Sequence, residues 1–167
     1  LDREQEVELT IDIAAAFHRE STTSWNTVAE IPGSDKNAEV VMAGAHLDSW
    51  HAGTGATDNA AGSAVVLEAM RILKTLGVKP KRTIRVVLFT NEENGGAGGR
   101  GYRDAHKTEL EKHVLALESD SGVFRPRGFG FTGTDTARKK LTEIASLLKP
   151  LGADAIGAGA PDKGIRL

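Results

Sequence analysis

Apolar and polar residues alternate in the first part of the chain and then give way to longer apolar runs. Apolar residues recur at every second position over residues 7–17, which predicts a half-buried strand. Residues 26–31 predict a second strand, which ends at the turn signal PGSD of residues 32–35. The apolar runs at residues 40–45 and 83–90 are typical of strands covered on both faces.

The later part of the chain predicts helices between further strands. Helices are expected at residues 59–76, 98–107 and 134–148, and Gly77 ends the first of them. Residues 113–118 predict another strand, and Phe129 and Phe131 are expected to continue the sheet or its edge. Strand and helix therefore alternate over most of the sequence.

This order of elements predicts an α/β fold with three αβα layers, in which helices cover both faces of a central mixed, mostly parallel sheet. No helix separates the first two predicted strands, so we expect an antiparallel pair at one side of the sheet. A length of 167 residues fits one domain, and residues 1–167 are expected to form it.

Composition excludes several classes of partner and of active site. The net charge of −2 provides no basic surface, so neither nucleic acid nor an anionic membrane is an expected partner. No apolar run approaches the ~20 residues that span a bilayer. The sequence has no cysteine, which excludes disulfides, thiolate nucleophiles and cysteine-bound zinc.

Acidic and histidine residues gather just after the apolar runs. Four short segments share this placement, and they are AHLDSW at 45–50, GATDNAAG at 55–62, FTNEENGG at 89–96 and ALESDSG at 116–122. Because α/β proteins assemble sites where strands give way to loops, these side chains are expected at one edge of the sheet. Carboxylates and imidazole there predict a two-metal hydrolytic centre.

Each residue also has a plainer interpretation when it is taken alone. His46 and Asp48 form an H-x-D pair, in which Asp48 can orient His46 or contact it without binding the metal. The alternative is a surface histidine beside an aspartate that caps a helix. Asp58 precedes a predicted helix and fits an N-cap. Glu118 competes with Asp120 for the last position.

The adjacent carboxylates of Glu92 and Glu93 follow a buried strand, where a divalent cation would cancel their repulsion. One of them can then bind metal while the other acts as a general base. The alternative is a solvated first turn of a helix, which favours acids.

The glycine run at residues 96–101 matches the dinucleotide pattern G-x-G-x-x-G, with Asp120 further along the chain. Glu92 and Glu93 would repel a pyrophosphate there, and the glycines begin several residues after the strand ends. A nucleotide-binding oxidoreductase is therefore a weak alternative. No G-x-S-x-G or P-loop pattern is present.

The motifs GAHLDSW, GATDNAAGSAVVLEAMRIL, KPKRTIRVVLFTNEENGGAGGRGY and ALESDSG together resemble the zinc aminopeptidase and glutamate carboxypeptidase family. The resemblance runs from about residue 26 to residue 151. It implies a di-zinc exopeptidase that hydrolyses small peptides and is secreted or periplasmic, with a possible homodimer. It further implies a cis peptide bond between Asp58 and Asn59.

The same resemblance implies a role for each residue at the sheet edge. His46 and Asp120 would bind one zinc, Glu93 the other, and Asp58 would bridge both. Glu92 would be the general base, and Asp48 would support His46.

The chain departs from the family pattern after Asp120, where it contains no histidine to complete the second zinc site. We therefore expect a fragment that lacks an N-terminal portion and the C-terminal third, with an incomplete sheet. The tail 157–167 resembles the segment before the missing part, with Asp162 near the site. One zinc ion or none, and little peptidase activity, are expected. A non-catalytic binding domain with the same fold is the alternative function.

Overall fold

A computed structural model describes residues 8–35, 37, 39–120 and 122–159 of the chain. The main sheet has four strands, which are β1 (Thr27–Ile31), β2 (Val40–His46), β3 (Thr83–Phe89) and β4 (His113–Glu118). The helices are α1 (Ala61–Thr75), α2 (Ala97–Ala105) and α3 (Asp135–Ser146). Short 3-10 segments lie at Lys107–Lys112 and Lys149–Leu151. These bounds agree with the predicted ones to within a few residues, which is the usual uncertainty of element ends.

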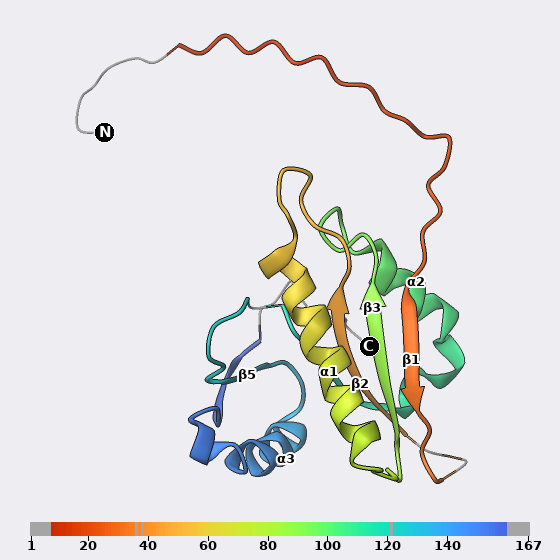
Figure 1. Cartoon of the computed structure of the whole chain (residues 1–167), viewed down its shortest axis with the longest axis vertical. Coiled ribbons are helices and arrows are strands. Elements are labelled where there is room, and N and C mark those ends of the chain that lie inside the picture. The colour runs from red at the N-terminus through yellow and green to blue at the C-terminus, as the bar shows by residue number, and fades with distance from the viewer. Residues whose placement is uncertain (1–7, 36, 38, 121, 160–167) are drawn as a thin grey trace, which may run out of the picture.

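The sheet has the order β1-β3-β2-β4 (Figure 1). β2 pairs in parallel with both β3 and β4, and β1 pairs antiparallel with β3. The predicted mixed, mostly parallel sheet is therefore confirmed. The antiparallel pair also lies at one side, but it joins β1 to β3 rather than to the segment before it.

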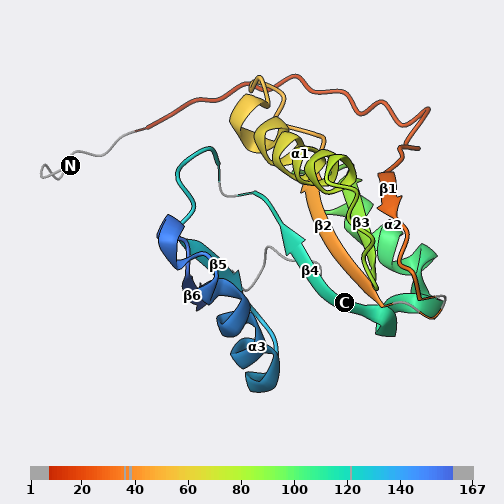
Figure 2. The same ribbon diagram turned by 60° about the horizontal axis from the view of Figure 1, so that its bottom comes forward.

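Helices α1 and α2 cover opposite faces of the sheet (Figure 2). On one face Val66 of α1 packs with Ala45, Val86 and Leu88. On the other face Tyr102 of α2 packs with a second buried cluster, whose other members are Val40, Met42, Val87 and Phe89. Residues 86–89 of β3 thus point alternately to the two cores, which explains why this part of the strand is apolar throughout and confirms the three layers.

Phe129 and Phe131 do not continue the main sheet. They belong to β5 (Gly128–Phe131), which pairs in parallel with β6 (Ala155–Ala158) in a separate sheet. Helix α3 packs beside these strands and buries Leu141. Figure 2 shows this small unit next to β4. The apolar pattern located the strand but carries no information about its partner.

The predicted strand at residues 7–17 is not formed in the part that the structure describes. Residues 8–26 contain no strand or helix, and Figure 1 shows them as a long arc that leaves the body. The alternating apolar side chains of Leu9 and Ile13 are 76% and 78% exposed. Alternation gives a segment two unlike faces, but a strand also needs a partner for its backbone groups, and none lies alongside. Val7 lies outside the described residues.

The connections of the sheet create a topological switch point at one edge. The chain leaves β2 through α1 on one face and enters β3, then leaves β3 through α2 on the other face and returns to β4 on the far side of β2. Connections after β2 and β3 therefore diverge to opposite faces. Such a switch point at the carboxyl ends of parallel strands is where open α/β sheets bind ligands.

Candidate metal centre

The predicted site residues meet at this edge of the sheet. His46 is the last residue of β2. Glu92 and Glu93 follow β3, Asp120 follows β4, and Asp58 lies just before α1. These side chains thus reach the same edge of the sheet from the ends of β2, β3 and β4 and from just before α1.

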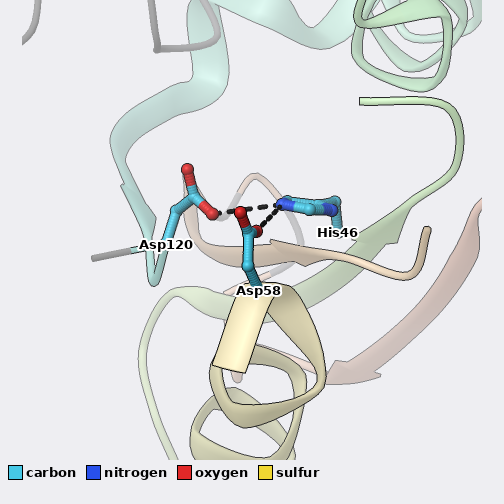
Figure 3. Close-up of side chains that lie close together, drawn as sticks. All are labelled: His46, Asp58 and Asp120. Carbon is cyan, nitrogen blue, oxygen red and sulfur yellow. Dashed lines mark hydrogen bonds and ion pairs between the residues drawn. The ribbon is translucent and has the colours of Figure 1, made fainter. Parts of the chain in front are cut away.

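His46, Asp58 and Asp120 converge on one point (Figure 3). The His46 Nε2 atom lies 3.0 Å from Asp58 Oδ1 and 3.1 Å from Asp120 Oδ1. One ligand atom from each residue lies within 4.8 Å of the others, a spacing that can hold a metal ion. Glu92 is close but further out, because its Oε2 atom is 3.9 Å from His46 Nε2.

His46 is buried and its ring is fixed from both sides. The Nδ1 atom lies 3.0 Å from the backbone carbonyl oxygen of Asp48, to which it can donate, so that Nε2 faces the carboxylates. Ser63 Oγ donates to the carbonyl oxygen of His46 at 3.0 Å. Burial alone would lower the pKa of His46, but the charge and hydrogen bond of Asp120 and the carbonyl of Asp48 raise it overall.

Asp48 supports His46 mainly through that carbonyl rather than through its carboxylate. Its Oδ1 atom lies 3.6 Å from His46 Nδ1. The carboxylate instead accepts hydrogen bonds from the backbone N–H groups of Glu92 at 2.9 Å and Glu93 at 3.1 Å. Asp48 therefore links the end of β2 to the two glutamates that follow β3.

Asp58 faces His46 and does not cap the helix. The Asp58–Asn59 peptide bond is cis, as the family resemblance implied. The buried side chain of Asn59, which sequence reasoning missed, accepts the Gly62 N–H at 3.1 Å and donates to the Ser119 carbonyl at 2.9 Å. An asparagine just before a helix is a capping signal that could have identified it.

Glu92 and Glu93 precede α2 and lie in the loop after β3, so the interpretation as a first helical turn is wrong. The Oε1 atom of Glu93 is buried without a hydrogen-bond partner among the described residues. Partial burial and the negative charges of Asp58 and Glu92 raise the pKa of Glu93. An orphaned carboxylate oxygen of this kind fits a cation ligand.

The charge balance of the edge fits a divalent cation. Among the described residues, His46 is the basic partner in each ion pair recorded for the neighbouring carboxylates, which are those of Asp48, Asp58, Glu92 and Asp120. One imidazole does not balance this negative charge. Imidazole with carboxylate oxygens, and no sulfur, is a donor set that zinc accepts.

A pocket of about 240 Å³ opens beside the acids. Its walls are the loop after β2, including Trp50, together with Asp58 and Glu93. A ligand in this pocket would contact both an indole and the carboxylates of the site.

The competing residues take other places. Asp120 rather than Glu118 lies against His46. His18 and His51 are exposed. The His106 ring stacks on Tyr102, with centroids 4.0 Å apart. Asp162 lies outside the described residues.

Known proteins resemble this chain in sequence and in fold. The sequence matches the family described as Peptidase family M28 over residues 26–166. Carboxypeptidase Q of Rattus norvegicus is 50% identical over 130 residues, which cover 78% of this chain and 28% of the relative. Leucine aminopeptidase 2 of Trichophyton equinum is 37% identical over 115 residues, covering 68% of this chain and 22% of the relative.

A solved structure described as a peptidase M28 precursor from Shewanella amazonensis SB2B superposes with a TM-score of 0.74 at 44% identity. The match covers 84% of this chain and 33% of that one. The chain thus spans about a third or less of the length of these relatives.

Proposed function

The chain belongs to peptidase family M28, and on that premise we propose that it carries the metal-binding part of a di-zinc exopeptidase acting on small peptides. The family is the one predicted from the motifs, and the homologues support a metallopeptidase. The observation that carries the proposal is the convergence of His46, Asp58 and Asp120 within 4.8 Å.

In this proposal the residues at the sheet edge divide into ligands and a base. His46 and Asp120 would hold one zinc and Glu93 a second, and Asp58 would be a ligand shared by both. When bound, zinc polarises the carbonyl of the scissile peptide bond and lowers the pKa of bound water.

Glu92 is the proposed general base. Its carboxylate lies near His46 but outside the group of ligand atoms, so it can face a substrate. It accepts a proton from the attacking water and returns it to the leaving amine, which balances the hydrolysis. The Asp48 carboxylate accepts the backbone N–H of Glu92, which leaves the Glu92 carboxylate free for this proton transfer.

The second zinc position is proposed to be weak in this chain. Asp58 and Glu93 supply only oxygen ligands there, and no histidine follows Asp120 in the sequence. Zinc in proteins is held best by sites that include nitrogen or sulfur. One tightly bound zinc and little peptidase activity are therefore expected of these 167 residues.

A secreted or periplasmic location is proposed for the whole protein. The support is the similarity to a protein described as a precursor. Within the residues that the structure describes, every helix is too short or too polar to cross a bilayer.

Zinc titration by calorimetry tests the proposal, with three variants of the chain. The wild type is expected to bind about one equivalent of Zn²⁺ tightly, and His46→Ala to lose that step, because the imidazole is the only nitrogen ligand. Glu92→Gln should retain the zinc step while losing any dipeptide hydrolysis that the wild type shows.

His51→Ala is the matched control, because it removes an exposed histidine five positions from His46 and should leave binding unchanged. Tight binding that survives His46→Ala would rule out the proposed centre. Retained hydrolysis in Glu92→Gln would overturn only the assignment of Glu92 as the general base.

A further inference from the structure

The loop that carries both glutamates is closed at its base by the side chain of Asn26, the residue just before β1. This loop is taken from Thr90, directly after β3, to Gly98, the second residue of α2. The Asn26 side chain accepts the Thr90 N–H at 3.0 Å and donates to the Gly98 carbonyl at 2.8 Å. One amide group therefore holds both ends of the loop.

The sheet register explains how Asn26 reaches this place. Thr27 of β1 pairs with Leu88 of β3 in the antiparallel ladder. Asn26 directly precedes Thr27, so it lies beside the point where the chain leaves β3. Its side chain is half-buried there, and the amide offers one acceptor and one donor of the required polarity.

The ends of the loop approach so closely that they need glycine. The Gly98 N–H donates to the Thr90 carbonyl at 2.9 Å. A Cβ atom at Gly98 would clash with that carbonyl oxygen and would lie 2.6 Å from Asn26 Oδ1. The glycine run that resembles a dinucleotide pattern thus serves the close approach of helix and strand at this position.

The loop has a second anchor at Asp48, whose carboxylate accepts the Glu92 and Glu93 N–H groups. Between these anchors Asn91 has φ of 54°, a left-handed conformation that asparagine tolerates better than most residues. Without Asn26, the base of the loop would lose two hydrogen bonds and keep those from the Gly98 N–H to the Thr90 carbonyl and from the Ala97 N–H to the Asn91 carbonyl. The Ser24 hydroxyl would also still contact the Thr90 hydroxyl at 2.7 Å. Functional side chains must be held to within about 0.5 Å, so the loss of both Asn26 hydrogen bonds is expected to loosen the position of Glu92 and Glu93.

We infer that Asn26 is a positioning residue, which closes the base of the loop at residues 90–98 and so fixes Glu92 and Glu93 at the metal centre. The effect of this closure on a metal centre rests on the proposed function. Asn26 has no recorded contact with the carboxylates or with His46 and acts through the backbone of the loop.

Amide hydrogen exchange measured by NMR on the whole chain tests the closure. In Asn26→Ala, the Glu92 and Glu93 amides should exchange about tenfold faster or more, because the loop opens locally. The amides of Val86 and Val87 in the core of β3 report global stability and should change by less than about twofold. Thr27→Ala, an exposed neighbour on β1, is the matched control and should leave the loop unchanged.

Addition of Zn²⁺ to the same samples tests the consequence. The His46 imidazole signals should respond in the wild type and in Asn26→Ala, whereas the Glu93 signals should respond fully only in the wild type. If Asn26→Ala does not fold, Asn26→Asp keeps the acceptor for Thr90 and loses the donor to Gly98, and it should show the same changes to a smaller extent.

The outcomes separate the inference from the proposed function. Unchanged Glu92 and Glu93 exchange in a folded variant overturns the closure. Faster exchange with an undiminished Glu93 response to zinc overturns the positioning role, and leaves Asn26 a local structural residue. No response of His46 in the wild type contradicts the proposed function itself and removes the positioning role with it.

Discussion

The carboxylate of Asp48 accepts two successive backbone N–H groups, those of Glu92 at 2.9 Å and Glu93 at 3.1 Å. Its backbone carbonyl meanwhile holds His46 Nδ1 at 3.0 Å. One residue therefore fixes both the imidazole and the acidic loop. Such support around metal ligands sets how well a site is organised before the ion binds.

Asp48→Asn is predicted to weaken zinc binding about tenfold to a hundredfold. The asparagine amide keeps one acceptor but turns a donor toward a backbone N–H, so one of the two hydrogen bonds is lost. The backbone carbonyl that orients His46 remains, which is why some affinity should survive. Calorimetric titration with Zn²⁺ measures the change.

Asp154→Asn, at an exposed position remote from the site in sequence, is the control for the loss of one negative charge. An affinity in Asp48→Asn equal to that of this control would show that the carboxylate has no part in the centre.

Sequence reasoning named the residues with charged side chains at the site but not the amides that support them. His46 and Asp120 could be predicted because each lies at or just after the end of an apolar strand, and Asp58 because it directly precedes a predicted helix. Asn59 bonds Ser119, 60 positions away, and Asn26 bonds Gly98, 72 positions away. Such partners depend on tertiary contacts that a local pattern does not contain.

At the scale of the elements, a buried arginine joins the end of the sheet remote from the site. Arg85 of β3 donates to Glu30 of β1 at 2.5 Å, and to Glu109 and Tyr102 at 2.6 Å each. The Tyr102 hydroxyl also bonds His113 Nε2 of β4 at 2.8 Å. This network links β1, β3, α2, the segment Lys107–Lys112 and β4.

Glu109→Gln is predicted to lower the free energy of unfolding by about 1–2 kcal/mol at pH 7, since Arg85 keeps Glu30 but loses a charged partner. The hydrogen bond from Arg85 holds the pKa of Glu109 below its usual value. The ionised carboxylate therefore stabilises the fold above the unfolded pKa of about 4.3, and that contribution is lost as pH falls through the lower folded pKa.

Urea unfolding at several pH values measures this difference. The gap between wild type and Glu109→Gln should be full at pH 7 and shrink below about pH 4.3. Glu111→Gln changes an exposed residue of the same segment and is the matched control. An equal loss in both variants, or a gap that does not depend on pH, would contradict the role of the network.

The elements that were predicted correctly are those whose own apolar pattern indicates that they are buried. β2 and β3 are covered on both faces, so residues 40–45 and 86–89 are apolar without a break and the strand positions are clear. The segment at residues 8–17 and the strand β5 also carry apolar residues, but their pairing depends on what lies beside them. A period of two predicts the faces of a strand and leaves its partner open.

At the scale of the whole molecule, the fold brings together residues from the ends of three parallel strands and from the start of α1. They meet at a topological switch point, because the connections after β2 and β3 pass to opposite faces of the sheet. This explains how one imidazole and several acids, spread over residues 46–120, occupy one place. The chain spans 28% of the length of the carboxypeptidase Q of Rattus norvegicus, so the activity of a whole protein remains a proposal for it.

The most direct test of the metal centre is anomalous X-ray scattering at the zinc edge from crystals of the chain grown with Zn²⁺. The strongest peak is predicted about 2.0–2.2 Å from His46 Nε2, with carboxylate oxygens of Asp58 and Asp120 at similar distances. A strongest peak at His106 or His113, with none at His46, would contradict the account.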